Sequence, residues 1–274
     1  MVFIAGQFSA DEILCNIPPH TLRIDLQARR WKSDVDSDSA IVDKNDNGIP
    51  IEIILLGFTP YFGNLGMRNQ EEFLRIAYIG VSPNHRLLPP RCVTTSMISG
   101  KSSQKNFISY FQTLYNNRIN CASVVTTTKF VTRSFNERDP VTGADGAKIN
   151  FNALEFADRP ASNDEETSLI EDINAWLSDR GTPLITAALK SHIPGSDLVE
   201  LPLGADHTEI KAQFAATRGP VSERSFASAA APAKALKSAV VDDDEKANQS
   251  APPQVKKAVE LTAEQAKVLG IDLD

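Results

Sequence analysis

Hydrophobic and polar residues alternate in several stretches of the first 160 residues. In residues 20–31, Leu22, Ile24 and Leu26 fall on one side of an extended backbone, and Arg23 and Asp25 fall on the other. This period of two is typical of a half-buried strand. Three further apolar stretches predict strands at 51–58, 73–81 and 91–98. Glycines and a proline after residue 56 predict that the second of these four strands ends near residue 58.

The longest strand pattern covers residues 120–136, which are rich in Val, Thr and Phe. In its second half Lys129, Arg133 and Phe135 share one face. A turn-rich stretch joins it to a second alternating segment at 147–157. Together the two segments predict a long β-hairpin with a polar tip.

Two helices are predicted from periodicity and capping. Apolar residues between 107 and 115 recur at the spacing of one helix face, so a helix is expected from Ser102 or Ser103 to about residue 117. Most of its rings are expected in the core, with Tyr110 on the exposed side. Ser162 and Glu165 form an S-x-x-E capping box that opens a second helix. A third, short helix is predicted at 184–189.

The composition changes after residue 219. Residues 1–219 are expected to form one globular domain and residues 220–274 a separate tail, of which residues 220–250 are rich in Ala, Ser and Lys and carry little apolar area. This predicts a disordered, flexible tail. The tail ends in a hydrophobic-acidic peptide, which is typical of a docking handle for partner proteins, or else has no partner. Its last residues are Ile271, Asp272, Leu273 and Asp274.

Overall composition indicates an ordinary soluble protein, with 42% hydrophobic and 23% charged residues. No apolar run is long enough to span a bilayer, and the N-terminus lacks the pattern of a signal peptide. The three cysteines are widely spaced and form no C-x-x-C motif. We therefore expect no membrane, a reducing cytoplasm, and neither a disulfide framework nor a zinc site.

Charge is strongly segregated along the chain. Residues 61–138 hold ten lysines and arginines against three glutamates, within a chain of net charge −7, and they also contain all four tyrosines. Positive charge binds phosphates and flat rings stack on bases, so this mixture indicates a single-stranded nucleic-acid site. The alternative is that most of the rings are core and the charges form a solvated face.

Motifs for metal, nucleotide or catalysis are incomplete. Asp43, Asn45, Asn47 and Gly48 match the start of a calcium loop, but Ile54 stands where the motif needs a glutamate. The segment is better interpreted as a hairpin turn. Residues 100–102 resemble the end of a phosphate-binding loop without its first glycine. No catalytic signature is present, so we expect a protein without cofactor that is not an enzyme.

This order of strands, helix, long hairpin, linker and acidic tip resembles the single-stranded-DNA-binding proteins of phages and plasmids. The resemblance covers residues 20–157 and the last twenty residues. It implies an α+β, β-rich fold with an OB-like antiparallel barrel, a long β-hairpin and two or three helices. It also implies that the tail recruits replication or recombination proteins.

The same resemblance implies two sets of contacts. The residues expected to touch the strand itself are Tyr61, Phe62, Lys129, Arg133 and Phe135. Those expected to neutralise backbone phosphates are Arg86, Arg91, Lys101 and Lys105. The choice between DNA and RNA stays open, as does a homo-oligomer. The competing hypothesis is a structural or adaptor protein of a phage or plasmid that docks protein partners without binding nucleic acid.

Overall fold

The structure is a computed structural model of the 274-residue chain, and it describes residues 12–36, 38–138, 145–203 and 206–218. The chain divides into two units, Met1–Leu203 and Gly204–Asp274. Helix α4 (Thr208–Arg218) belongs to the second unit. The predicted tail and its terminal peptide at residues 271–274 lie outside the described residues.

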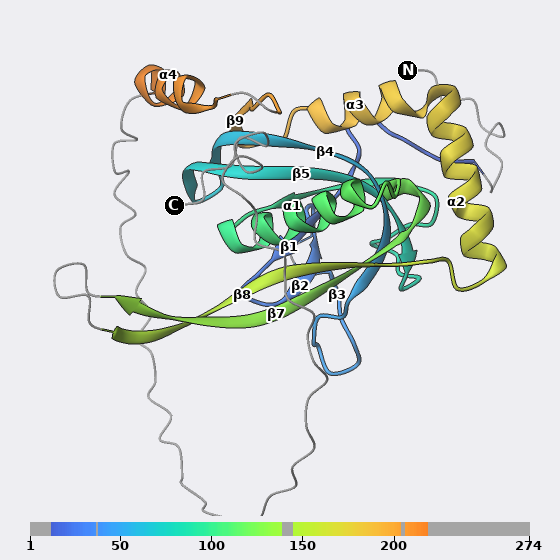
Figure 1. Ribbon diagram of the computed structural model, residues 1–274, viewed down its shortest axis with the longest axis horizontal. Helices are drawn as coiled ribbons and strands as arrows, with labels where there is room; N and C mark the ends of the chain where they lie inside the picture. Colours follow the sequence, from blue (N-terminus) through green and yellow to red (C-terminus); the bar gives the residue numbers. More distant parts are fainter. Residues whose placement is uncertain (1–11, 37, 139–144, 204–205, 219–274) are drawn as a thin grey trace, which may run out of the picture. The chain divides into compact units, whose positions relative to one another are not determined.

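A single curled sheet forms the first unit, and it has the shape of a half-barrel (Figure 1). Its order is β3-β2-β1-β6-β5-β4-β7-β8, and β9 also pairs with β4. Only β1 and β6 pair in parallel among the described strands. The strands are β1 (His20–Asp25), β2 (Arg30–Ser33), β3 (Ala40–Ile41), β4 (Ile51–Leu65), β5 (Arg68–Ser82), β6 (Val93–Ile98), β7 (Val125–Arg138), β8 (Asp145–Arg159) and β9 (Ser196–Glu200). The fold is therefore α+β and rich in strands, as the sequence predicts.

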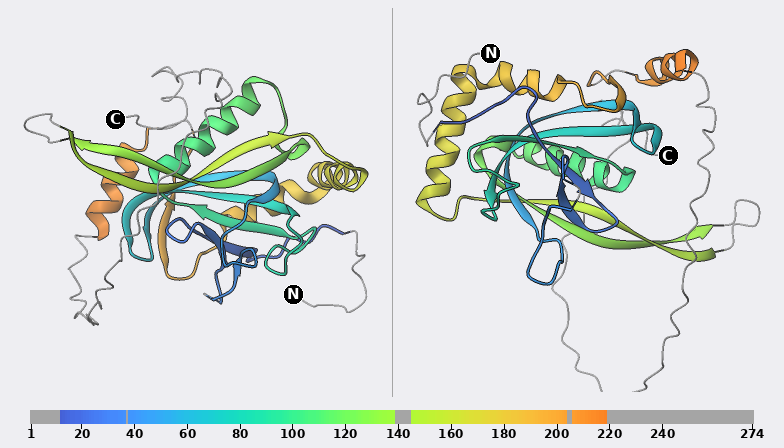
Figure 2. Two further views of the ribbon diagram at one scale, coloured as in Figure 1. Left: turned by 90° about the horizontal axis from the view of Figure 1, so that it is seen from below. Right: turned by 180° about the vertical axis from the view of Figure 1, so that it is seen from behind.

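Helices cover the two faces of the sheet differently (Figures 1 and 2). Helix α1 (Lys101–Asn116) packs on the face that carries Phe58 of β4 and Phe156 of β8. A 3₁₀ turn, η1 (Cys121–Ser123), leads from it to β7. The opposite face is covered by α2 (Asp164–Trp176), the π-helical turn η2 (Leu177–Gly181) and α3 (Thr182–Lys190).

Each face has its own apolar core. On the α1 side, the ring of Phe107 contacts Phe58 and Phe156 edge to face, at 5.2 Å between centroids in both cases. On the other side, buried side chains of the sheet pack against α2 and α3; among them are Ile54, Ala77, Ile79, Ile173, Trp176, Ile185 and Leu189. Removal of this apolar surface from water is the main force that holds the helices to the sheet.

Strand β4 is longer than predicted. The sequence predicts a break near residue 58, but the strand continues to Leu65 as a partner of β5. Its pairing register shifts between Leu55 and Gly57 and again between Gly63 and Leu65. Gly57 and Gly63 lie at these irregularities, so glycines that were interpreted as a break in the strand belong to bulges within it. Pro60 is tolerated because β9 pairs with β4 from Tyr61 onward, so no strand needs a proline N–H there.

Other predictions are confirmed with local corrections. The long hairpin is present as β7 and β8, and the first helix is present as α1. Tyr110 is buried, contrary to prediction, because its hydroxyl is 2.7 Å from that of Thr126, whereas Tyr115 is 75% exposed. The cap of α2 is Asn163, one residue after the predicted Ser162. In the described part of the chain, no helix is long and apolar enough to cross a membrane.

Candidate nucleic-acid interface

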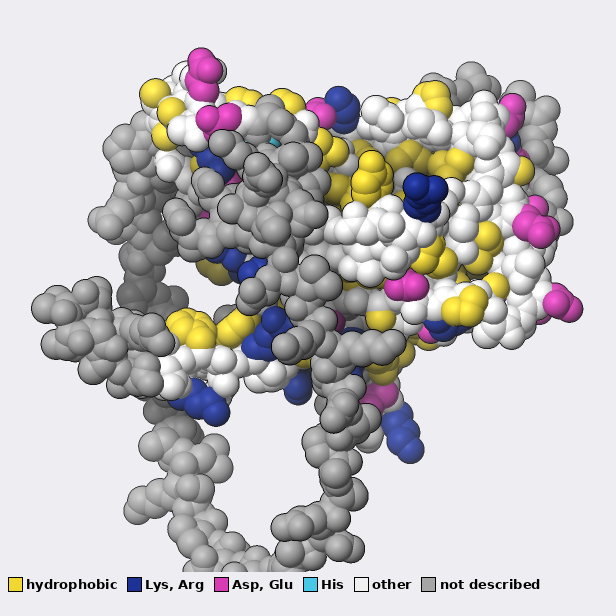
Figure 3. Space-filling model, viewed as in Figure 1, with side chains coloured by type: hydrophobic (Ala, Val, Ile, Leu, Met, Phe, Trp, Pro, Cys, Tyr) yellow, Lys and Arg dark blue, Asp and Glu magenta, His cyan; other side chains and the backbone are white. Residues whose placement is uncertain are grey.

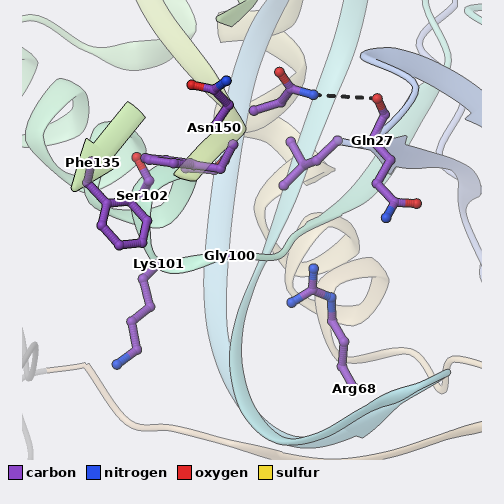
Figure 4. A pocket seen from close by; sticks show the side chains of 11 residues that line it. Gln27, Arg68, Gly100, Lys101, Ser102, Phe135 and Asn150 are labelled. Atoms are coloured by element: carbon purple, nitrogen blue, oxygen red, sulfur yellow. Dashed lines mark hydrogen bonds between the residues drawn. The ribbon is translucent and has the colours of Figure 1, made fainter. Parts of the chain in front are cut away.

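A groove of about 560 Å³ lies where four segments of the first unit meet (Figure 4). These segments are the turn after β1, the tip of the β4–β5 hairpin, the first turn of α1, and the outer half of the β7–β8 hairpin. The lining residues are Leu26, Gln27, Arg68, Gly100, Lys101, Ser102, Ser103, Phe135, Asn150, Phe151 and Asn152.

Helix α1 is fixed beside the edge of β8 by two side chains. The backbone N–H of Leu154 donates to Oγ of Ser103 at 3.0 Å, and Nδ2 of Asn106 donates to the carbonyl of Leu154 at 2.8 Å. The chain enters the helix through Gly100, whose φ of 87° lies in the region that favours glycine. The first turn of α1 therefore begins at the groove in a fixed position.

One wall of the groove is aromatic and amide-rich. The ring of Phe135 is 51% exposed and contacts the ring of Phe151 edge to face, with 5.8 Å between centroids. Asn152 donates through Nδ2 to the carbonyl of Gln27 at 3.4 Å, which links the hairpin to the turn after β1. Such a wall offers a flat apolar surface for stacking and amides that can hydrogen-bond a base edge.

Two cationic side chains approach the groove from different segments. Figure 4 shows Lys101 and Arg68 on opposite sides of it. Arg68 also donates to the carboxylate of Glu71 at 2.7 Å. The first turn of α1 contains no acidic residue, and Lys105, one turn further on, is exposed. The potential around this end of the helix is therefore favourable for an anion.

The structure brings together two of the residues predicted from sequence, Lys101 and Phe135, which both line the groove although they lie on different elements. Lys129 and Arg133 lie on β7 before Phe135 and do not line the groove. Lys129 is exposed, and Arg133 is engaged with Glu155 on the neighbouring strand at 2.7 Å. Figure 3 shows basic and hydrophobic side chains close together along this hairpin.

Tyr61 and Phe62 are not available for contact with a nucleic-acid strand, which corrects the prediction for both. They are 8% and 7% exposed. The hydroxyl of Tyr61 donates to the carbonyl of Leu189 at the end of α3, at 2.7 Å, and burial raises its pKa. The reason is the unbroken β4, because its continuation makes both residues part of an internal strand that pairs with β5 on one side and β9 on the other.

Arg86 and Arg91 lie elsewhere in the first unit. Arg86 donates to Oγ of Ser39 at 2.6 Å, and Arg91 donates to the carboxylate of Asp172 on α2 at 2.8 Å. Neither residue lines the groove. Their partners show that a count of basic residues along the chain does not by itself place them on one surface.

Sequence reasoning missed several residues of the groove. Arg68, Phe151 and the two asparagines were not selected, although the hairpin register pairs Phe151 directly with Arg133. The alternation of Asn150, Phe151 and Asn152 was available as a signal. It was interpreted only as the pattern of a strand.

Within the described ranges, no group of three or more His, Cys, Asp or Glu side chains could hold a metal ion, and the three cysteines are free. Burial raises the pKa of the Cys92 thiol, so this group is a poor nucleophile. Comparisons with protein-family models, with curated proteins and with solved structures find no match.

Proposed function

We propose that the chain binds single-stranded nucleic acid in the groove between α1 and the β7–β8 hairpin, without catalysing a reaction on it. The observation that carries the proposal is the convergence of Lys101 and Phe135 on one groove. A cation beside a half-exposed ring is the combination by which proteins bind a phosphate and stack the adjoining base. In this proposal the curled sheet serves as an OB-type platform in the cytoplasm.

Two further features support the proposal. Gln27, Asn150 and Asn152 supply amide groups next to the ring, so a stacked base would find hydrogen-bond partners. Arg68 reaches the groove from the β4–β5 tip, on the side opposite to Lys101. The recruitment of replication or recombination proteins by residues 271–274 is a separate part of the proposal and rests on sequence alone.

The test is fluorescence anisotropy with a labelled oligothymidylate of about 16 nucleotides, the upper site size of one OB fold. Phe135→Ala is expected to weaken binding about tenfold, because it removes a stacking surface. Lys101→Ala is expected to weaken it and to lower the salt slope by about one. Matched controls are Tyr115→Ala and Arg118→Ala, which remove an exposed ring and an exposed cation near the other end of α1.

Affinity that does not depend on salt, or an equal loss in the controls, would contradict the proposal. Oligouridylate and duplex DNA of equal length show whether the groove prefers DNA, RNA or unpaired strands. Absence of binding to all three would favour the adaptor hypothesis.

A further inference from the structure

The outer half of the β7–β8 hairpin, referred to below as the arm, extends beyond the rest of the sheet (Figure 1). It consists of residues 129–136 and 146–152. β7 pairs with β4 only at Thr126–Thr128, and β8 is the last strand in the order of the described sheet. The arm is therefore a ribbon of two strands, which is marginally stable by itself. Its apolar side chains include Phe135 and Ile149, which are 51% and 37% exposed.

The backbone of β8 shows which of its groups face the open edge. Both the backbone N–H and the backbone C=O of Leu154 bond to side chains of α1, so these two groups point away from β7. The direction of the backbone N–H and C=O groups alternates from one residue to the next along a strand. The register of β8 with β7 is regular from Leu154 to Lys148. Asn152, Asn150 and Lys148 therefore direct their N–H and C=O groups to the same edge, beyond the point where Ser103 covers it. An exposed edge of this kind is a template for another strand.

We propose that this edge pairs with the same edge of a second copy of the chain, antiparallel, about a two-fold axis at Ile149. In this register Lys148 of one copy lies opposite Asn150 of the other, and the outward backbone groups of both residues form hydrogen bonds. Ile149 faces Ile149 across the axis, and Ala147 faces Phe151. A two-fold axis makes such an interface self-complementary.

The neighbouring registers are less favourable for physical reasons. An axis at Lys148 would set two ammonium groups directly opposite each other, and like charges in this position are destabilising. An axis at Asn150 would carry the second strand to Leu154, where Ser103 and Asn106 already occupy the edge. With the axis at Ile149, each Lys148 faces a neutral amide, whose oxygen can accept from the ammonium group. The groove beside Asn150 and Asn152 leaves room for the added strand.

This pairing does not depend on nucleic-acid binding, but it uses the same groove. Asn150 and Asn152 line the groove and also belong to the open edge. A second copy and a nucleic-acid strand would therefore compete for this part of the molecule. The expected consequence is that the nucleic-acid strand binds the monomer and that dimers form when the nucleic acid is absent.

Sedimentation equilibrium of the full chain without nucleic acid tests the pairing. The wild type is expected to dimerise with increasing concentration. Ile149→Asp and Ile149→Lys are each expected to weaken dimerisation about tenfold or more, because each sets two like charges face to face at the axis. An equimolar mixture of the two variants is expected to regain association, because opposite charges then meet. A monomeric wild type, or failure of the mixture to associate better than either variant, would overturn the proposal.

A pair of proline variants tests which edge is used. Lys148→Pro removes an outward N–H from β8, whereas Thr132→Pro removes an outward N–H from β7, since Thr132 lies opposite Asn152. Both leave the bonds between β7 and β8 in place. Only Lys148→Pro is expected to abolish dimers, and equal behaviour of the two variants would exclude the β8 edge. Circular dichroism of both variants checks that they remain folded.

Addition of the oligothymidylate separates this proposal from the proposed function. If both hold, the oligonucleotide shifts the wild type toward monomers. If dimers form but no oligonucleotide binds, the edge pairing stands and the nucleic-acid proposal fails. If the oligonucleotide binds a wild type that is monomeric throughout, the pairing fails and the proposed function stands.

Discussion

The guanidinium of Arg133 on β7 donates to the carboxylate of Glu155 on β8, with 2.7 Å between Nη2 and Oε1. The two residues lie on the same face of the hairpin but four positions out of register, because Arg133 pairs directly with Phe151 and Lys129 pairs with Glu155. Both side chains are more than 40% exposed, so the pair contributes little to stability. Its main effect is to reduce the charge that Arg133 presents to a phosphate.

Glu155→Gln is therefore expected to increase affinity for single-stranded DNA. The freed Arg133 can engage a phosphate beyond the groove, which should raise affinity about threefold and the salt slope by about one. Anisotropy titrations at several salt concentrations measure both quantities. Asp158→Asn is the control, since it removes a carboxylate from the same strand near the body of the protein. An equal gain in this control would show that net charge, and not Arg133, is responsible.

Stability is expected to fall in acid because of one ionic bridge. Arg159 donates to Glu52 of β4 and to Glu166 of α2, at 2.7 Å in each case. The hydrogen bond from Arg159 is the largest cause of a lowered pKa of Glu166; together with hydrogen bonds from Ser162 it outweighs the opposing effect of burial and brings the pKa from 4.5 to about 2. A lowered pKa in the folded state means that the stabilisation is present above pH 4.5 and is lost as the pH falls toward 2.

Denaturant unfolding at a series of pH values measures this loss. Glu166→Gln is expected to cost about 2 kcal/mol at pH 7 and to flatten the decline between pH 4.5 and 2. Glu165→Gln, which changes an exposed neighbour, is expected to leave the stability at pH 7 and its decline in acid nearly unchanged. A wild-type stability that stays constant from pH 4.5 to 2 would contradict the assignment.

Tyr61→Phe is expected to affect stability but not nucleic-acid binding. The substitution removes the hydrogen bond to Leu189 and leaves the ring in place, so a loss of about 1 kcal/mol is expected from thermal or denaturant unfolding. Affinity for the oligonucleotide should match the wild type, in contrast to Phe135→Ala. Weaker binding by Tyr61→Phe with normal stability would restore this tyrosine to the site.

Gly181→Ala is expected to destabilise the packing of α2 and α3 on the sheet. A Cβ at this position would overlap the ring of Trp176, whereas a Cβ at Gly57 would meet Leu189 at an ordinary 3.6 Å. We expect Gly181→Ala to cost about 2 kcal/mol and Gly57→Ala to be nearly neutral. Melting temperatures compare the two variants. A neutral Gly181→Ala would show that the tryptophan ring can move aside.

The sequence predicts the elements of this fold better than their partners. Period-two alternation and helical spacing identify β1, α1 and the β7–β8 hairpin, because half-buried elements repeat with the geometry of the backbone. The same rules fail at β4, where the interpretation of Gly57 and Pro60 as breakers overlooks bulges that only tertiary pairing stabilises. β9 is missed because its five residues are only partly buried and carry no alternation.

The candidate site is predicted less completely for a related reason. Lys101 and Phe135 were selected for their residue types, and they meet because α1 is tied to the edge of β8. Tyr61 was selected on the same grounds but is buried by the extension of β4. Exposure and ion pairing depend on neighbours from distant parts of the chain, such as Glu155 or Leu189. A single sequence without the fold does not show these neighbours.

The extension of β4 has a consequence for how the chain acquires its structure. β4 and β5 are joined by a tight connection and pair along nearly their whole length, so this hairpin can form from local contacts alone. β7 and β9 both add to β4, but from positions more than 60 residues further along the chain. We therefore expect the β4–β5 hairpin to be the folding nucleus, and its amide protons to exchange with solvent more slowly than those of any other element.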